Sequence, residues 1–402
     1  MPVDATHALA MGNRSYPGSL VIGMNPGGGL FVLNTITCEE YVLGTLSAQV
    51  FDTAPQEAMK TQAVVLRTRA LYELGRRHPG EDFHFCPNAG CCWEYGWKRP
   101  LPQRLIEAVT STSGQVLCYE SRPILACFDT NAGGCTEDID AAWPGNRPLD
   151  YPYLRRVASP TDESGSAATR DYAECWEWKD RVVQPSALRQ RMEESYRIDI
   201  GAVTELEIRS RTTSGRVREL AVTGRQASRL VVGSDRVRMI LGTPSSLLDA
   251  DISTVGLTNG VFRVSGRGQG SGVGLSQHGA LGMALAGAEY DEILGDYYPG
   301  VNLVEDFGEG RSRCLSSGIT EGAGERARSL GGPIIRVGLL FGEDAPTAVL
   351  VLGTGIWRAG QQQGVFDGEV RAEACGNEVV LASGGRRRVV GDTVDLSPSR
   401  DG

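Results

Sequence analysis

Apolar residues recur at helical spacing between Cys38 and Gly75, and this pattern predicts two consecutive helices. The first is expected over residues 39–50 and the second from about residue 56 to 74. In the second helix the apolar positions alternate in steps of three and four and form one stripe: Met59, Ala63, Leu66, Ala70 and Leu74. Between the helices, Thr53 and Gln56 have capping-box spacing. The segment therefore predicts a helical hairpin.

Shorter apolar stretches on both sides of this hairpin predict strands. Strands are expected over residues 19–24, 29–36, 115–119, 123–128, 203–210, 217–223, 237–241 and 262–266, with three more in the tail after Gly332. Further helices are expected over residues 174–197, 276–288 and 290–298. The predicted fold class is therefore α+β: a helical hairpin packed on β-strands around a cleft, with an inserted α/β subdomain and a C-terminal β-rich subdomain.

Two polar stretches suggest where these parts join. Residues 163–168 are polar, and residues 308–332 are rich in Gly, Ser and Glu, as linkers are. The domain boundaries predicted from them are 14–160 for the first part of the core, 161–258 for the inserted subdomain, 259–307 for the second part of the core, 308–332 for a linker and 333–398 for the C-terminal subdomain.

Composition narrows the class of protein. The 402 residues include 41% hydrophobic and 22% charged residues, as in ordinary globular proteins, and the net charge is −9. Because Lys and Arg are scattered along an acidic chain, nucleic acid is not expected as a partner. No apolar run approaches the roughly 18 residues of a membrane span. Residues 1–14 contain no apolar core of a signal peptide, so no secretory signal is visible.

The ten cysteines cluster, with six of them between Cys86 and Cys135. Disulfide pairing among them would fit an oxidising compartment. No CxxC pair is present among them, so a standard zinc knuckle is not predicted.

Three segments resemble, in the same order, the family of stage II sporulation protein D, which also includes the amidase enhancers of the bacterial wall. They are EEYVLGTLSAQ with QEAMKTQAVVLRTRAL, CFDTNAGGCTED with YPYLRRVASPTD, and GRGQGSGVGLSQHGALGMALAG with YDEILGDYYPG. The resemblance spans about residues 16–304. It implies an extracytoplasmic protein of the cell wall or periplasm that binds peptidoglycan glycan strands, with another wall hydrolase as a further candidate partner.

Characterised members of this family are lytic transglycosylases, which cleave glycan strands with one carboxylic acid and leave 1,6-anhydro ends. The resemblance places Gln49 where the family has its catalytic glutamate. A glutamine donates hydrogen bonds but releases no proton near neutral pH, and losing general acid–base catalysis costs roughly 10²–10⁴-fold in rate. The enzyme assignment is therefore uncertain. Gln49 can be a natural residue or an introduced replacement of glutamate.

Two functions are compatible with this substitution, and a third requires in addition that the cleft be filled. The first is a lytic transglycosylase scaffold that is impaired or inactive. The alternative is a non-catalytic glycan-binding or amidase-enhancing wall protein. The third is a structural cell-surface module whose cleft is filled.

The same resemblance suggests further site residues. Glu137 matches a family acid and is a candidate substitute acid, although a carboxylate that braces the adjacent turn is the more common case. The candidate substrate-binding residues are Gln62, Arg67, Gly133, Gly134, Gln269, Ser271, Ser276 and Gln277. For Arg67 the structural alternative is a buried side chain that braces a carboxylate or backbone carbonyls. The family usually has Trp and His at Gln269 and Ser271. A phosphate-binding loop is disfavoured there because no Lys-Ser/Thr follows.

The same resemblance raises zinc as an alternative. Some family members bind zinc beside the Gly-Gly segment, and here Cys127 and Cys135 flank that segment. The family histidine is replaced by Asp129. Disulfides or free thiols are therefore favoured over zinc, and no other cofactor is expected.

Overall fold

The computed structural model describes residues 8–25, 28–49, 53–88, 90–96, 101–169, 173–249, 254–255, 257, 260–305, 307, 333–340, 346, 348–383 and 386–398. The chain forms two compact units. The first contains Met1–Asp52, Gln62–Val116 and Val304–Gly402, and the second contains Thr53–Thr61 and Leu117–Leu303.

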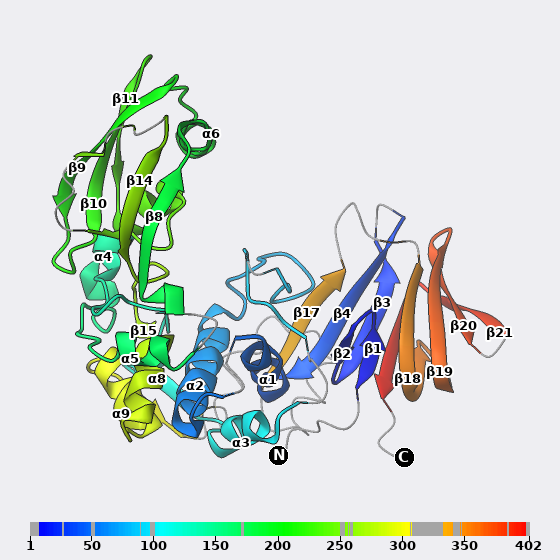
Figure 1. The fold of residues 1–402 in the computed structure, drawn as a ribbon. Coiled ribbons are helices and arrows are strands. Elements are labelled where there is room, and N and C mark those ends of the chain that lie inside the picture. Colours follow the sequence, from blue (N-terminus) through cyan, green and yellow to red (C-terminus); the bar gives the residue numbers. More distant parts are fainter. Residues whose placement is uncertain are drawn as a thin grey trace. The chain divides into compact units, whose positions relative to one another are not determined.

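The first unit is built on one sheet that contains strands from both ends of the chain, and N-terminal and C-terminal strands pair directly in it (Figure 1). Its path is β17-β4-β3-β22-β18-β19-β20-β21, and β1 and β2 join beside β18. The strands are β1 Leu9–Met11, β2 Arg14–Tyr16, β3 Ser19–Met24, β4 Leu30–Thr37, β17 Ile334–Leu340, β18 Ala348–Ala359, β19 Gln362–Cys375, β20 Glu378–Ser383, β21 Arg386–Gly391 and β22 Thr393–Pro398. The C-terminal strands therefore do not form the separate sheet that a C-terminal subdomain over 333–398 would have.

The pairing of β4 with β17 and of β3 with β22 follows from buried side chains. In β4, Leu30, Val32, Leu33 and Ile36 are buried, and β17 contributes Ile334, Ile335 and Val337 to the same core. Ile36 lies opposite Ile335 in the antiparallel register. Each strand alone would expose this apolar surface to water, so the distant segments associate.

Helices α1 (Cys38–Gln49), α2 (Gln56–Glu73) and α3 (Gln103–Ser111) complete the first unit, apart from the start of α2, and the predicted helical pair is confirmed. At the junction of β4 and α1, the backbone N–H of Thr37 donates to the Glu40 carboxylate at 2.7 Å, and the N–H of Glu40 donates to Thr37 Oγ1 at 3.3 Å. This reciprocal pair starts the helix.

The second unit contains several small sheets and short helices. The strands are β5 Val116–Tyr119, β6 Arg122–Pro123, β7 Phe128–Asp129, β8 Glu177–Val183, β9 Val203–Arg211, β10 Val217–Gly224, β11 Ser228–Val232, β12 Leu247–Leu248, β13 Thr254–Val255, β14 Phe262–Arg267, β15 Leu275–Ser276 and β16 Asn302–Val304. The helices are α4 Ile139–Ala142, α5 Asp162–Ala167, α6 Pro185–Tyr196, α7 Ser234–Leu241, α8 Gln277–Leu285 and α9 Tyr290–Tyr297, with 3-10 turns η1 Pro148–Asp150 and η2 Ala173–Cys175.

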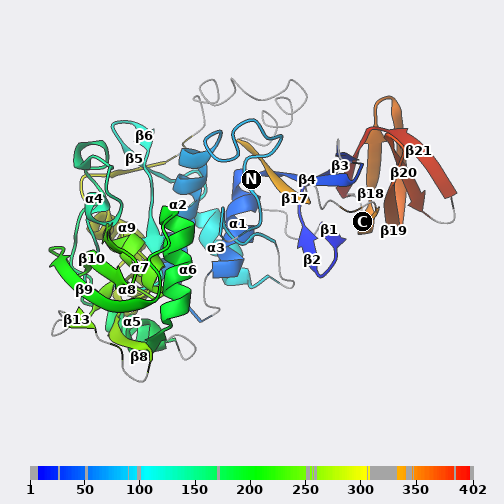
Figure 2. The ribbon, with the colours of Figure 1, turned by 90° about the horizontal axis from the view of Figure 1, so that it is seen from above.

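The region expected as an insertion has a core of its own. Helices α6 and α7 pack beside the sheet β11-β10-β9-β13 (Figure 2). Their apolar side chains, including Leu188, Met192 and Val237, share one buried cluster with Leu206 of β9. The cluster also includes Val264, so it extends past residue 258, the predicted end of the inserted subdomain.

Three element predictions in this unit were wrong. Residues 177–183 form strand β8 rather than helix, because they pair with β14 and bury Trp178 and Val183. Residues 237–241 belong to helix α7 rather than a strand, since Val237, Ile240 and Leu241 are buried at helical spacing. Of the strand expected over 123–128, only the two ends pair.

Within the described part of the chain, no helix is both long and apolar enough to cross a membrane.

Candidate functional site

Gln49 is the last residue of α1, and its side chain is half-buried. Its Oε1 lies 3.5 Å from Nε2 of Gln62, which is 3% exposed on α2. This distance is at the outer limit of a hydrogen bond. The structure therefore brings two predicted site residues together in the first unit, and both carry carboxamides. Neither can serve as a general acid.

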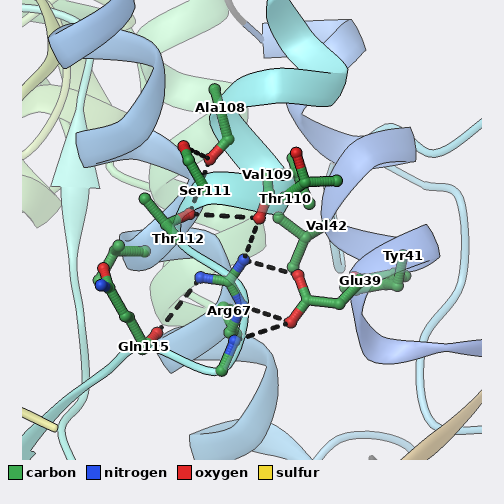
Figure 3. A network of polar contacts seen from close by, with 12 residues as sticks. Glu39, Tyr41, Val42, Arg67, Ala108, Val109, Thr110, Ser111, Thr112 and Gln115 are labelled. Atoms are coloured by element: carbon green, nitrogen blue, oxygen red, sulfur yellow. Dashed lines mark hydrogen bonds and ion pairs between the residues drawn. The ribbon is translucent and has the colours of Figure 1, made fainter. Parts of the chain in front are cut away.

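Arg67 is a brace inside the first unit (Figure 3). Its side chain is 1% exposed, and its guanidinium donates to both carboxylate oxygens of Glu39 at 2.8 and 2.6 Å. It also donates to the carbonyls of Gln115 at 3.2 Å and Val109 at 3.3 Å. Such a bidentate, fully engaged guanidinium fits the structural alternative, because no exposed donor is left to contact a sugar directly.

The second unit brings together two of the predicted motifs. Backbone hydrogen bonds run both ways between Asn131 and Gln269, at 3.1 and 2.8 Å. Gly133 and Gly134 have φ values of 71° and 96°, which favour glycine. A Cβ on Gly268 would lie 2.9 Å from the Asn131 carbonyl oxygen. The Gly-Gly turn and the glycine loop therefore pack backbone against backbone, which only glycine allows.

A buried carboxylate holds the turn from behind. The N–H of Gly134 donates to Asp162 Oδ2 at 2.8 Å, and Oγ of Ser276 donates to Oδ1 of the same carboxylate at 2.5 Å. Ser276 is also the N-cap of α8, where it accepts the N–H of Gly279. Ser276 is fully buried, whereas Gln277 beside it is half-buried. Ser276 thus positions the turn, and Gln277 is the more accessible of the two.

Ser271 contacts another buried carboxylate. Its Oγ donates to Asp129 Oδ2 at 2.5 Å, and the N–H of Gly272 donates to the same oxygen at 2.7 Å. Burial raises the pKa of Asp129 from 3.8 to about 6, although both hydrogen bonds oppose the shift. Burial also lowers the pKa of His278 to about 4. These groups therefore titrate in the acidic range.

Glu137, the candidate substitute acid, is fully buried. Its carboxylate accepts hydrogen bonds from the N–H of Asp138 at 3.0 Å and from Oγ of Ser214 at 2.9 Å. Its own N–H donates to the Gly272 carbonyl at 2.8 Å. These contacts match the bracing alternative, because a general acid must reach its substrate.

Arg216 is a central residue that sequence reasoning missed. It lies after the β9–β10 turn and is fully buried. Its guanidinium donates to the carbonyls of Ala132 at 2.6 Å and Cys135 at 2.9 Å, on either side of the Gly-Gly turn. Burial lowers its pKa. The sequence offers no signal for it, because an arginine after a hairpin turn is usually solvated.

A candidate metal centre lies in the first unit, away from the residues suggested for zinc. Among the described residues, one group of side chains could hold a metal ion: the ligand atoms of His78, Cys86, Cys91 and Cys92 all lie within 4.8 Å of one another. Nε2 of His78 lies 3.4 Å from Sγ of Cys92 and 3.6 Å from Sγ of Cys91. Cys127 and Cys135 are not part of it. The signal missed was one histidine and three cysteines within a short segment.

Two segments of the chain match models of protein families. Residues 27–119 match the stage II sporulation protein family, and residues 151–274 match a domain of unknown function. Stage II sporulation protein D of Bacillus subtilis is 27% identical over 289 residues, which cover 68% of this chain and 76% of that protein. The Bacillus amyloliquefaciens protein of the same name is 28% identical over 289 residues, which again cover 68% of this chain and 76% of that protein.

The amidase enhancer of Bacillus subtilis is 24% identical over 276 residues, which cover 62% of this chain and 38% of that protein. The matches define a domain of the stage II sporulation protein family followed by a segment that matches a domain of unknown function. Residues 27–119 therefore carry a domain of the stage II sporulation protein family, and the chain is similar to stage II sporulation protein D and to the amidase enhancer.

Proposed function

We propose that this protein binds peptidoglycan glycan strands on a lytic transglycosylase scaffold whose acid position is held by Gln49, so that turnover is low or absent. The observation that carries the proposal is the pair of carboxamides, Gln49 and Gln62, at the end of α1. The family relationship supports a role at the cell wall, and hence an extracytoplasmic location.

The chemistry explains why Gln49 matters. A lytic transglycosylase needs a carboxylic acid that first protonates the glycosidic oxygen. As carboxylate it then accepts the proton of the sugar's own C6 hydroxyl, through an oxocarbenium-like transition state. The amide of Gln49 can orient a sugar by hydrogen bonds but cannot perform either proton transfer. Glu137 is enclosed by its own partners. Binding without efficient cleavage is the result.

The second candidate is a non-catalytic protein that assists another wall hydrolase. The relationship to the amidase enhancer favours it. A structural cell-surface module that does not bind glycan is the third candidate.

The test compares the protein that has Gln49 with its Gln49→Glu variant on peptide-free glycan strands, with anhydro ends counted by mass spectrometry. We expect both proteins to bind and the Glu form to cleave at least about 100-fold faster, the lower end of general acid–base contributions. Gln363→Glu, on an exposed part of β19, is the matched amide-to-acid control and should change nothing. Binding by both forms without cleavage by either supports the assisting role. If neither form binds glycan strands, the result supports the structural cell-surface module.

We also propose that His78, Cys86, Cys91 and Cys92 hold a structural zinc ion. With Zn–S of about 2.3 Å and Zn–N of about 2.0–2.1 Å, tetrahedral ligand atoms lie about 3.5–3.8 Å apart. The distances from His78 are close to this, and the two adjacent thiols are 4.0 Å apart. Burial raises the pKa of Cys92 to about 12, and a bound cation would favour its thiolate. The buried hydroxyl of Tyr41 has no hydrogen-bond partner among the described residues, and after burial the Cys92 thiol is the largest contributor to the raised pKa of Tyr41.

Metal analysis of the purified protein tests this site. We expect about one zinc per chain, lost in Cys92→Ser together with several degrees of melting temperature. Cys375→Ser, at an exposed free cysteine on β19, is the control and should retain zinc. A natural chain without zinc, or a Cys92→Ser variant that keeps it, would contradict the assignment.

A further inference from the structure

The main path of the sheet in the first unit ends in two edge strands, β17 and β21, and these edges differ. The β17 edge is covered by a short stretch between α2 and α3. There the N–H of His84 donates to the Arg336 carbonyl at 2.8 Å. The N–H of Gly338 donates to the Phe85 carbonyl at 2.9 Å. Within the described part of the chain, no strand or bridge pairs with the outer side of β21 (Figure 1), so its backbone N–H and C=O groups there can pair with a further strand.

The open strand is strongly basic. Its first three residues are Arg386, Arg387 and Arg388; all three are exposed, and the strand contains no acidic residue. Because successive side chains of a strand point to opposite faces, both faces of this edge are cationic. The neighbouring strand β20 has one carboxylate, Glu378, which the antiparallel register places beside the last residues of β21. The whole chain has a net charge of −9, so this edge is a local departure from its acidic character.

Two of the three arginines are oriented by neighbours without being fully neutralised. The guanidinium carbon of Arg388 lies 5.3 Å from the centroid of the Trp357 ring, a contact that orients the side chain and leaves it exposed. Arg387 pairs with Glu373, but the same carboxylate also pairs with Arg371 at 2.9 Å. One negative charge is therefore shared by two guanidinium groups. Side chains that are already oriented lose less conformational freedom when a ligand binds.

We propose that the open side of β21 docks an extended acidic segment of another protein, which adds a strand to this sheet. The backbone of β21 supplies the ladder hydrogen bonds, as in other cases of strand addition. Carboxylates opposite the three arginines supply cross-strand ion pairs. A polyanion without a peptide backbone uses the charges but not the ladder, so a peptide is the occupant that uses both features of the edge.

Charges on an edge strand have a second consequence, which agrees with this docking. They discourage uncontrolled pairing between sheet edges. The repulsion acts on basic and neutral strands, whereas an acidic strand turns the same charges into an attraction, so the arginines also select the partner. The proposal concerns the sheet of the first unit and does not depend on glycan binding.

The test measures binding of the peptide TTVEEE, capped at both ends and labelled with fluorescein, by fluorescence anisotropy at low salt. Paired antiparallel with β21, it places its glutamates opposite the three arginines and its valine opposite Val389, which is 49% exposed. In an antiparallel pair, alternate residues direct their N–H groups to the partner strand. We expect N-methylation of one alternate set of peptide residues to weaken binding at least about tenfold, because two or three hydrogen bonds are lost. Methylation of the other set should change it little.

Charge reversal tests the side chains. Arg386→Glu changes an exposed residue that none of the ion pairs among the described residues includes. We expect it to weaken binding about fivefold, since an exposed ion pair is replaced by a repulsion, and to reduce the salt dependence of binding. Arg229→Glu is the matched control, because it reverses an exposed arginine on β11, an edge strand of a sheet in the second unit. It should bind the peptide like the unmodified protein.

The alternatives give different results. Equal affinities for the two methylated peptides, or an affinity for inorganic polyphosphate that matches that for TTVEEE, would show that the edge only attracts anions and would overturn the proposal. Unchanged binding in Arg386→Glu, or an equal loss in Arg229→Glu, places the peptide elsewhere and overturns it too. A protein that is dimeric by analytical ultracentrifugation and becomes monomeric in Arg386→Glu assigns the edge to a second copy of this chain instead. None of these outcomes bears on glycan binding, which is tested separately.

Discussion

Two buried arginines, one in each unit, show how the same side chain is accommodated in different ways. Arg67 is 1% exposed and makes a bidentate pair with Glu39, supplemented by two carbonyls. Arg216 is fully buried and donates to two carbonyls and the hydroxyl of Ser214. Among the described residues none of its direct hydrogen-bond partners is a carboxylate, although the charge of Glu137 acts to raise its pKa.

The difference indicates what each arginine does. The pair of Arg67 and Glu39 joins α1, α2 and the end of α3 (Figure 3), so it holds α1, which ends at Gln49, against the other two helices. Arg216 holds the backbone on both sides of the Gly-Gly turn. The charge of Arg67 is neutralised by the Glu39 carboxylate beside it. The charge of Arg216 has no such direct partner, so its burial carries a desolvation cost while its hydrogen bonds fix the shape of the loop. Three predictions test this comparison.

The largest effect is expected for Arg67→Met. Removing the guanidinium leaves the Glu39 carboxylate without its partner, which costs about 3–5 kcal/mol of unfolding free energy for a buried pair. Urea unfolding followed by circular dichroism measures it. The double variant Glu39→Met with Arg67→Met should recover much of the loss, since no lone charge remains. A loss below about 1 kcal/mol in the single variant would show that the pair is not the brace described.

A pH-dependent effect is expected at Asp129, near Arg216. Burial raises the pKa of Asp129 in the folded protein from the ordinary 3.8 to about 6. The folded state is therefore more stable when the Asp129 carboxyl is protonated. The associated stability is present below pH about 4 and is lost as pH rises through about 6. The Asp129→Asn variant does not lose stability in this way, because an asparagine side chain does not ionise. Relative to the natural chain it should gain up to about 3 kcal/mol between pH about 4 and about 7.

Unfolding measured across that pH range checks the Asp129 prediction. His278 titrates in both proteins, and because its pKa is lowered to about 4 its contribution has the opposite sign, falling away as pH decreases. Its effect cancels in the difference between the two proteins. A difference that does not change with pH would mean that Asp129 ionises normally in the fold.

The smallest effect on stability is expected for Arg216→Met. The carbonyls of Ala132 and Cys135 lose their donor, which costs about 1–3 kcal/mol, but the desolvation of a poorly compensated cation is relieved at the same time. Hydrogen exchange should show faster exchange at the N–H of Gly134. A loss as large as that of Arg67→Met would remove the distinction between the two arginines.

Local pattern predicted the elements whose apolar residues repeat regularly. Helices α1, α2 and α9 lie close to their expected positions, as do strands β9 and β10 with the turn at Gly215. Prediction from the local pattern failed where contacts with segments distant in the sequence determine the secondary structure. Residues 177–183 look helical alone but pair with β14, and residues 237–241 look extended but pack as a helix against β10 and β11. Neither partner is visible in the local sequence.

The candidate site divides in the same way. The motifs around Gln49, Gly133 and Ser276 are found from the sequence because residue identity and order carry them. Burial separates Arg67 and Glu137, which brace the fold, from Gln269 and Gln277, which remain accessible. Residue type alone cannot make that separation, since an arginine or glutamate serves either role.

The sequence by itself determined the resemblance to the stage II sporulation family, the helical pair and the amide at position 49, because each depends on neighbouring residues along the chain. Only the tertiary structure decided that strands from both ends share a sheet, that Arg216 reaches the Gly-Gly turn, and that the stretch around Phe85 covers the β17 edge of that sheet. These contacts join residues far apart in sequence, and their energy comes from surface removed from water and from polar groups paired on folding.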